Sequence, residues 1–139
     1  MSTGSTTKDR FLHEGFEYIG RFFENSLKEV AGRNPDLEFG FRRIDSDCFT
    51  VALYRAGNKV CKGSAREGGK SIGREGIEYS MTDNPNQSGM NEALYVKVDS
   101  QSMYFEALGM QSYGQTREKL TFEGAAELLW AIFIGPLQE

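Results

Sequence analysis

The sequence has little of what a metal site or a nucleophile site needs, with one histidine and two cysteines among 139 residues. A zinc site usually takes about four Cys, His or carboxylate ligands, so Cys48, Cys61 and His13 do not suggest one. His13 follows Leu12 in a predicted helix, and no nucleophile motif accompanies it. We therefore predict that His13 lies on the helix surface, and we predict no catalytic residues, no metal and no cofactor.

Long hydrophobic runs are also missing. The longest apolar run extends from Leu128 to Ile134, whereas a membrane span needs about 18 apolar residues. The opening stretch MSTGSTTKDR is polar and lacks the apolar segment of a secretion signal. The sequence thus predicts no membrane span, a cytoplasmic location and two free thiols.

Aromatic residues are plentiful, with ten Phe, six Tyr and one Trp, so the chain can build a core as one domain. The formal net charge of −4 argues against nucleic acid as a general partner. The charge is uneven, because six Lys or Arg residues and one acid lie from Arg55 to Arg74. This segment is where an anionic partner would be sought.

Two amphipathic helices are predicted at the ends of the chain. The first covers residues 9–31, after a disordered tail at 1–8, and ends before Gly32 and Pro35. Its apolar stripe repeats every three or four residues and comprises Leu12, Phe16, Ile19, Phe23, Leu27 and Val30. The second begins after Thr121, which is expected to cap it, and ends at Gly135-Pro136.

Six segments between the helices alternate apolar and polar residues as strands do: 37–41, 49–53, 59–66, 77–81, 94–98 and 103–107. A turn at Ser46 would place Phe41 opposite Val51, and a turn at Ser100-Gln101 would place Val98 opposite Met103. Both hairpins then gather their large apolar residues on one face.

The fold class predicted for residues 9–139 is a single α+β domain. An N-terminal helix precedes a six-stranded, mostly antiparallel meander sheet, and a C-terminal helix packs on one sheet face. A strongly curved sheet or partial barrel, closed by the last helix, is the alternative.

The segment GSAREGGKS at 63–71 resembles a phosphate-binding P-loop but departs from it. Ser64 stands where the motif requires its first glycine. A strand pattern follows Gly76, whereas a P-loop leads into a helix whose N-terminus faces the phosphates. A nucleotide-hydrolysing P-loop is therefore rejected.

The same region supports a simpler hypothesis, an anion site. Gly-rich backbone can form an anion-binding nest, and nearby cations would add positive charge. The candidate residues are Lys62, Arg66, Lys70 and Arg74 with Gly68 and Gly69. A turn at Gly57-Asn58 would put Lys62 opposite Leu53 and Arg66 opposite Phe49, both on the core face. The same turn would put Cys61 opposite Tyr54, with Cys48 beyond disulfide reach. A solvated, charged hairpin is the other interpretation.

The first functional hypothesis is a non-enzymatic binding module that acts through a protein partner or through self-association, as an adaptor, chaperone-like protein or inhibitor. Surplus aromatic area on the helices, or an exposed strand edge, could form a homodimer. Tyr95, Tyr104 and Trp130 are the candidate partner-binding residues. The alternative is a binder of an anionic or phosphorylated small molecule at the basic, Gly-rich segment 55–76. An enzyme whose site assembles from separated residues is a third hypothesis.

Overall fold

The computed structural model describes residues 3–68, 76–82, 92–108 and 119–138, and it has the predicted α+β architecture. The elements are α1 (Thr3–Arg33), β1 (Leu37–Asp45), β2 (Cys48–Arg55), β3 (Asn58–Glu67), β4 (Gly76–Ser80), β5 (Glu92–Val98), β6 (Met103–Ala107) and α2 (Phe122–Gln138). The strands form one sheet in the order β1 to β6, with each antiparallel to the next. This confirms the predicted meander.

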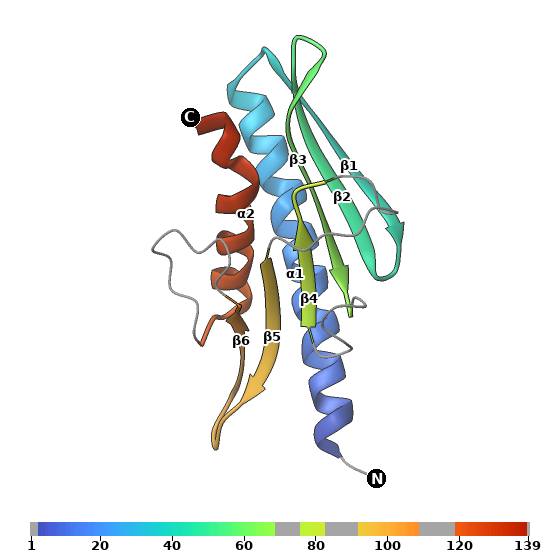
Figure 1. Ribbon diagram of the computed structural model, residues 1–139, viewed down its shortest axis with the longest axis vertical. Helices are drawn as coiled ribbons and strands as arrows, with labels where there is room; N and C mark the ends of the chain where they lie inside the picture. Colours follow the sequence, from blue (N-terminus) through green and yellow to red (C-terminus); the bar gives the residue numbers. More distant parts are fainter. Residues whose placement is uncertain (1–2, 69–75, 83–91, 109–118, 139) are drawn as a thin grey trace.

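Both helices pack on the same face of the sheet, called here the inner face (Figure 1). They lie side by side and run in the same direction, with Phe23 of α1 in edge contact with Trp130 of α2 at 5.4 Å between ring centroids. Neither described helix combines the length and apolar character needed to cross a membrane.

Helix α1 is longer than its apolar stripe predicts. Residues 3–8 are helical, whereas the sequence suggested a disordered tail up to residue 8. Once the packed part around Leu12 and Phe16 has formed, each added turn extends an existing helix and needs no new nucleus. At the other end, the Asn34 side chain donates to the Val30 carbonyl at 2.8 Å, and Pro35 follows.

Helix α2 begins as predicted and ends later than predicted. The backbone N–H of Gly124 donates to Thr121 Oγ1 at 3.0 Å, which confirms the cap. The helix continues through Pro136 to Gln138, so the predicted stop at Gly135-Pro136 is wrong. A proline this close to the end removes one intrahelical bond. Leu137 is half-buried against the core, which favours the extra turn.

Two hairpins have the predicted register. In β1–β2, Phe39 lies opposite Leu53 and Phe41 opposite Val51. In β5–β6, Val96 lies opposite Phe105 and Val98 opposite Met103. The turn residues explain this agreement, because Asp45 Oδ1 accepts the Asp47 N–H at 2.8 Å and holds the first turn where the sequence placed it.

The β2–β3 register differs from the prediction by one residue. The turn residues are Ala56 and Gly57, both with positive φ (52° and 81°), rather than Gly57 and Asn58. An irregularity follows between Leu53 and Tyr54, and Cys61 then pairs with Leu53. Two positive φ angles are typical of a type I′ turn, whose twist suits a hairpin as well as the predicted type II′ turn does.

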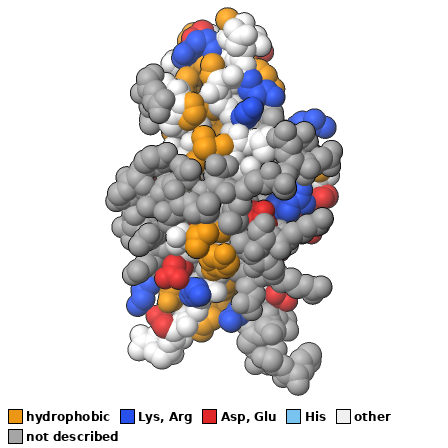
Figure 2. All heavy atoms as spheres, viewed as in Figure 1, with side chains coloured by type: hydrophobic (Ala, Val, Ile, Leu, Met, Phe, Trp, Pro, Cys, Tyr) orange, Lys and Arg blue, Asp and Glu red, His pale blue; other side chains and the backbone are white. Residues whose placement is uncertain are grey.

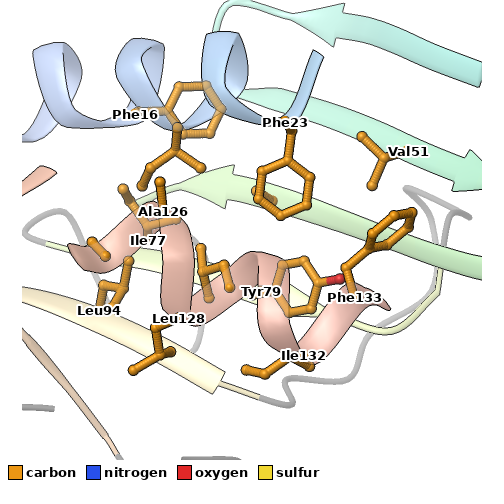
Figure 3. Close-up of a cluster of buried hydrophobic side chains, with 14 of the residues drawn as sticks. Phe16, Phe23, Val51, Ile77, Tyr79, Leu94, Ala126, Leu128, Ile132 and Phe133 are labelled. Atoms are coloured by element: carbon orange, nitrogen blue, oxygen red, sulfur yellow. The ribbon is translucent and has the colours of Figure 1, made fainter. Parts of the chain in front are cut away.

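The core lies between the inner face and the two helices. Figure 3 shows Tyr79 of β4 in this cluster, among Phe23 of α1 and Ile132 and Phe133 of α2. Tyr79 is fully buried, and its ring centroid lies 6.4 Å from that of Phe23. Burial of these aromatic and aliphatic side chains accounts for the attachment of both helices to the sheet.

Candidate functional site

The predicted anion site is divided by the structure. Gly69, Lys70 and Arg74 lie outside the described residues. Lys62 pairs with Ala52 and Arg66 pairs with Cys48, so both cations lie on the outer face of the sheet. Their predicted place on the core face is therefore wrong, because a register change of one residue moves every side chain to the opposite face.

The described part of the anion site offers less than the sequence suggested. Gly68 has a φ of 68°, and its backbone N–H donates to the Gly76 carbonyl at 2.7 Å, so this amide is already used. Arg66 lies opposite the carboxylate residue Glu78 in the β3–β4 register. In the view of Figure 2, coloured Lys and Arg side chains are interspersed with Asp and Glu. The anion site stays a prediction.

The two cysteines lie on opposite faces of the sheet. Cys61 belongs to the inner-face core, whereas Cys48 points to the outer face. Both are free and buried, and burial raises the pKa of each thiol above its usual value. Within the described ranges, no three His, Cys, Asp or Glu side chains are grouped so that they would hold a metal ion.

The three predicted partner-binding residues do not form one surface. Tyr95 and Tyr104 are half-buried on the outer face of β5 and β6. Lys97 Nζ lies 6.0 Å from the Tyr95 ring centroid, and Lys119 Nζ lies 5.9 Å from that of Tyr104. Trp130 lies in the helix layer against the inner face, where its ring centroid is 5.4 Å from that of Phe133.

His13 has a partner that the sequence did not predict. It is exposed, as expected, yet its Nδ1 lies 3.1 Å from Glu67 Oε1 and links α1 to the end of β3. The Glu67 side chain is 17% exposed. Burial raises the pKa of its carboxyl, whereas the hydrogen bond with His13 lowers it. No signal in the sequence joins two residues so far apart along the chain.

A second ion pair links α1 to β1. Arg43 Nη2 lies 2.7 Å from Glu17 Oε1, and the guanidinium carbon lies 5.7 Å from the centroid of the Phe16 ring. Near the start of β1, Arg55 Nε lies 2.9 Å from Asp36 Oδ2. In the middle, Phe41 stacks on Phe49 with 5.2 Å between centroids. Strand β1 is thus fixed near both ends and at its centre.

The free side of β1 is the most distinctive surface of the described residues. Strand β1 pairs with β2 along one edge. Among the described residues, no strand or isolated bridge pairs with its other edge. The opposite edge of the sheet differs, because Phe105 of β6 and Leu120 exchange backbone hydrogen bonds of 2.9 and 2.8 Å. Strand β1 has nine residues and carries two exposed large apolar side chains, Phe39 (36% exposed) and Ile44 (38%).

An open strand edge has a defined chemical capability. Its unpaired N–H and C=O groups can pair with another extended backbone, and alternate side chains provide selectivity. The side chains of β1 that point to the inner face include Phe39 and Phe41, and those that point to the outer face include Glu38 and Arg42. Sequence reasoning named an exposed strand edge in general but did not identify β1, since strand order decides which strand is at the edge.

Comparison with known proteins places this chain in a family. The model of the Y4lF protein domain matches residues 38–135. The uncharacterized protein y4lF of Sinorhizobium fredii (strain NBRC 101917 / NGR234) is 49% identical over 132 residues, which is 94% of this chain and 41% of that protein. The chain thus spans about two fifths of the length of this relative. No solved structure matches the chain. With the family model matching most of its length, the chain belongs to the Y4lF protein domain family.

Proposed function

We propose that this domain is a non-enzymatic protein-binding module that binds by adding a strand to the free edge of β1. The observation that carries the proposal is the contrast between the two sheet edges. At one edge, β6 exchanges backbone hydrogen bonds with Leu120. At the other edge, the nine-residue strand β1 has no pairing on the side away from β2 among the described residues. Main-chain hydrogen bonds along such an edge supply affinity in strand-addition complexes.

The attachment of β1 to the domain supports this role. The ion pairs Arg43–Glu17 and Arg55–Asp36 and the stacking of Phe41 on Phe49 hold the strand in its extended form before any partner arrives. A surface that is already ordered loses less conformational entropy on binding than a flexible segment does. The exposed Phe39 and Ile44 side chains would then add apolar contact area.

Charged residues on an edge strand often serve to prevent pairing, and β1 contains several. Their arrangement weakens that objection. Arg43 is already paired with Glu17, and Glu38 and Arg42 carry opposite charges. An edge of mixed charge repels a partner strand much less than an edge of one sign. The proposal places the module in the cytoplasm, where its two free thiols would remain reduced.

Site-specific photo-crosslinking tests the proposal. A benzophenone amino acid is placed at Phe39 or at Ile44, and as a control at Val98, which is 49% exposed at the end of β5. The cells that produce the chain are irradiated, and the masses of the adducts are determined. We expect adducts from the two β1 positions and few from Val98. Equal adducts from all three positions, or none from β1, would overturn the proposal.

A further inference from the structure

We infer that the strand that binds β1 is β1 of a second copy of this chain, in an antiparallel pair centred on Gly40. This inference rests on the proposed function, because it takes the free edge of β1 as the binding surface. It adds the identity of the partner and the register of the pairing. A two-fold symmetric pair requires a surface that is complementary to itself, so that residue i meets residue j and j meets i.

The charges of β1 meet this requirement. With Gly40 opposite Gly40, Glu38 of one copy lies opposite Arg42 of the other, and the symmetry repeats the contact. Both residues are exposed on the outer face, and neither has a recorded ion pair with a described residue. Along their own strand they stand about 13 Å apart, at about 3.3 Å per residue, too far to pair with each other. Directly opposite residues in antiparallel strands are about 5 Å apart.

The apolar residues of β1 are complementary in the same register. Phe39 of one copy lies opposite Phe41 of the other on the inner face, again twice by symmetry. Aromatic cross-strand pairs stabilise antiparallel sheets. The exposed part of Phe39 would be covered by this contact. Phe41 already stacks on Phe49, so the new pair would continue an aromatic row into the second copy.

Gly40 suits the centre of the pair. Gly40 has no side chain, and the space around it is open. Among the described residues, a Cβ atom built at this position would come within 4 Å of Tyr54 Cε1 alone, at 3.8 Å. Two backbones therefore approach at the symmetry axis without a side-chain clash. In a pairing shifted by one residue, outer-face residues of one copy would lie opposite inner-face residues of the other. The two sheets would then not share a common inner face.

Other registers that preserve the faces fit less well. Centring the pair on Phe41 puts Glu38 opposite Ile44, and centring it on Arg42 puts two arginines face to face. Centring it on Phe39 puts Glu38 opposite Gly40 and Arg42 opposite Asp36, which already pairs with Arg55. The register centred on Gly40 is the one of these four that matches Glu38 with Arg42.

Charge reversal provides a sharp test in the purified 139-residue chain, by sedimentation velocity over a range of concentrations. We expect the wild type to dimerise. Glu38→Arg or Arg42→Glu alone should weaken dimerisation about tenfold or more, because both cross-strand pairs become repulsive. An equimolar mixture of these two variants should dimerise again, since each contact then joins an acid to a base. The double variant Glu38→Arg/Arg42→Glu should also dimerise.

Matched charge changes elsewhere are the controls. Lys97→Glu on β5, which the strand order separates from β1, and Glu127→Arg on α2 alter exposed side chains and should leave dimerisation unchanged. Circular dichroism verifies that each variant is folded. A dimer that resists both β1 reversals, or no recovery on mixing, would overturn the proposed register. A monomeric wild type at every concentration would overturn the second copy as partner. In that case, crosslinks from Phe39 to another protein would leave the proposed function standing, and their absence would remove both.

Discussion

Gly63 of β3 faces the hydroxyl end of Tyr79, so that a Cβ atom at position 63 would meet the Tyr79 oxygen and stand 2.9 Å from its Cζ. Both residues are buried at the inner face. The ring of Tyr79 reaches across β3 because Gly63 leaves the space open. One glycine in the middle of the sheet is thus required by a side chain on the next strand.

Gly63→Ala should destabilise the domain by about 1–3 kcal/mol, because the new methyl group would overlap the fully buried Tyr79 side chain and force the packed core to shift. In the background Tyr79→Phe the cost should be smaller, since the oxygen that the new methyl group meets is gone. Urea denaturation of the four proteins of this double-mutant cycle gives the coupling energy, expected above about 0.5 kcal/mol. Additive effects would show that the two residues do not clash.

Tyr79→Phe alone should change stability little, or raise it by up to about 1 kcal/mol. The Tyr79 hydroxyl is buried and has no hydrogen-bond partner among the described residues, and such a group loses its water on folding without compensation. Burial also raises the pKa of this hydroxyl, which keeps it neutral. As a control, Tyr79→Leu should cost about 2–4 kcal/mol because it removes the ring. A loss above 1 kcal/mol for Phe would reveal a partner for the hydroxyl.

Two glycines of α1 should respond in opposite ways to alanine. A Cβ at Gly15 would lie 2.6 Å from Phe105 Cε2, in a fully buried ring, whereas a Cβ at Gly20 would lie 3.6 Å from Phe49 Cε2, an ordinary contact. Gly15→Ala should therefore destabilise by about 1–3 kcal/mol. Gly20→Ala should stabilise by up to about 1 kcal/mol through helix propensity. Thermal melting compares the two, and equal shifts would contradict the packing of α1 on β6.

The stability of the domain should depend on the ionisation of Glu67. The pKa of its carboxyl is raised by burial, so the folded state binds this proton more tightly than the unfolded state does. The free energy of unfolding should then fall as pH rises from the usual glutamate pKa through the raised one, and Glu67 adds no further change above it. Glu67→Gln should remove this part of the pH dependence.

Denaturation at a series of pH values upward from 4.5, the ordinary glutamate pKa, measures this effect. Glu14→Gln, an exposed change on α1, is the control and should leave the profile unchanged. His13→Ala removes the hydrogen bond that lowers the pKa of Glu67, so it should move the dependence to higher pH. An identical profile for wild type and Glu67→Gln would contradict the prediction.

The sequence predicted the structure best where local chemistry fixes the outcome. The turn at Asp45-Ser46-Asp47 determined which residues of β1 and β2 face each other, and Thr121 determined where α2 begins. The prediction failed where two local solutions have similar energies. Gly57 suits either of two hairpin turns, and the choice between them moved Lys62 and Arg66 to the other face of the sheet.

The amino-acid order by itself determined two amphipathic helices, six strands and the antiparallel arrangement of consecutive strands, because periodicity and turn residues act over a few neighbouring positions. Tertiary structure alone decided that β1 is a free edge, that His13 meets Glu67, and that Gly63 lies beneath Tyr79. These relationships join residues far apart in the chain. They depend on strand order and on how side chains fill the space between sheet and helices, which no local pattern specifies.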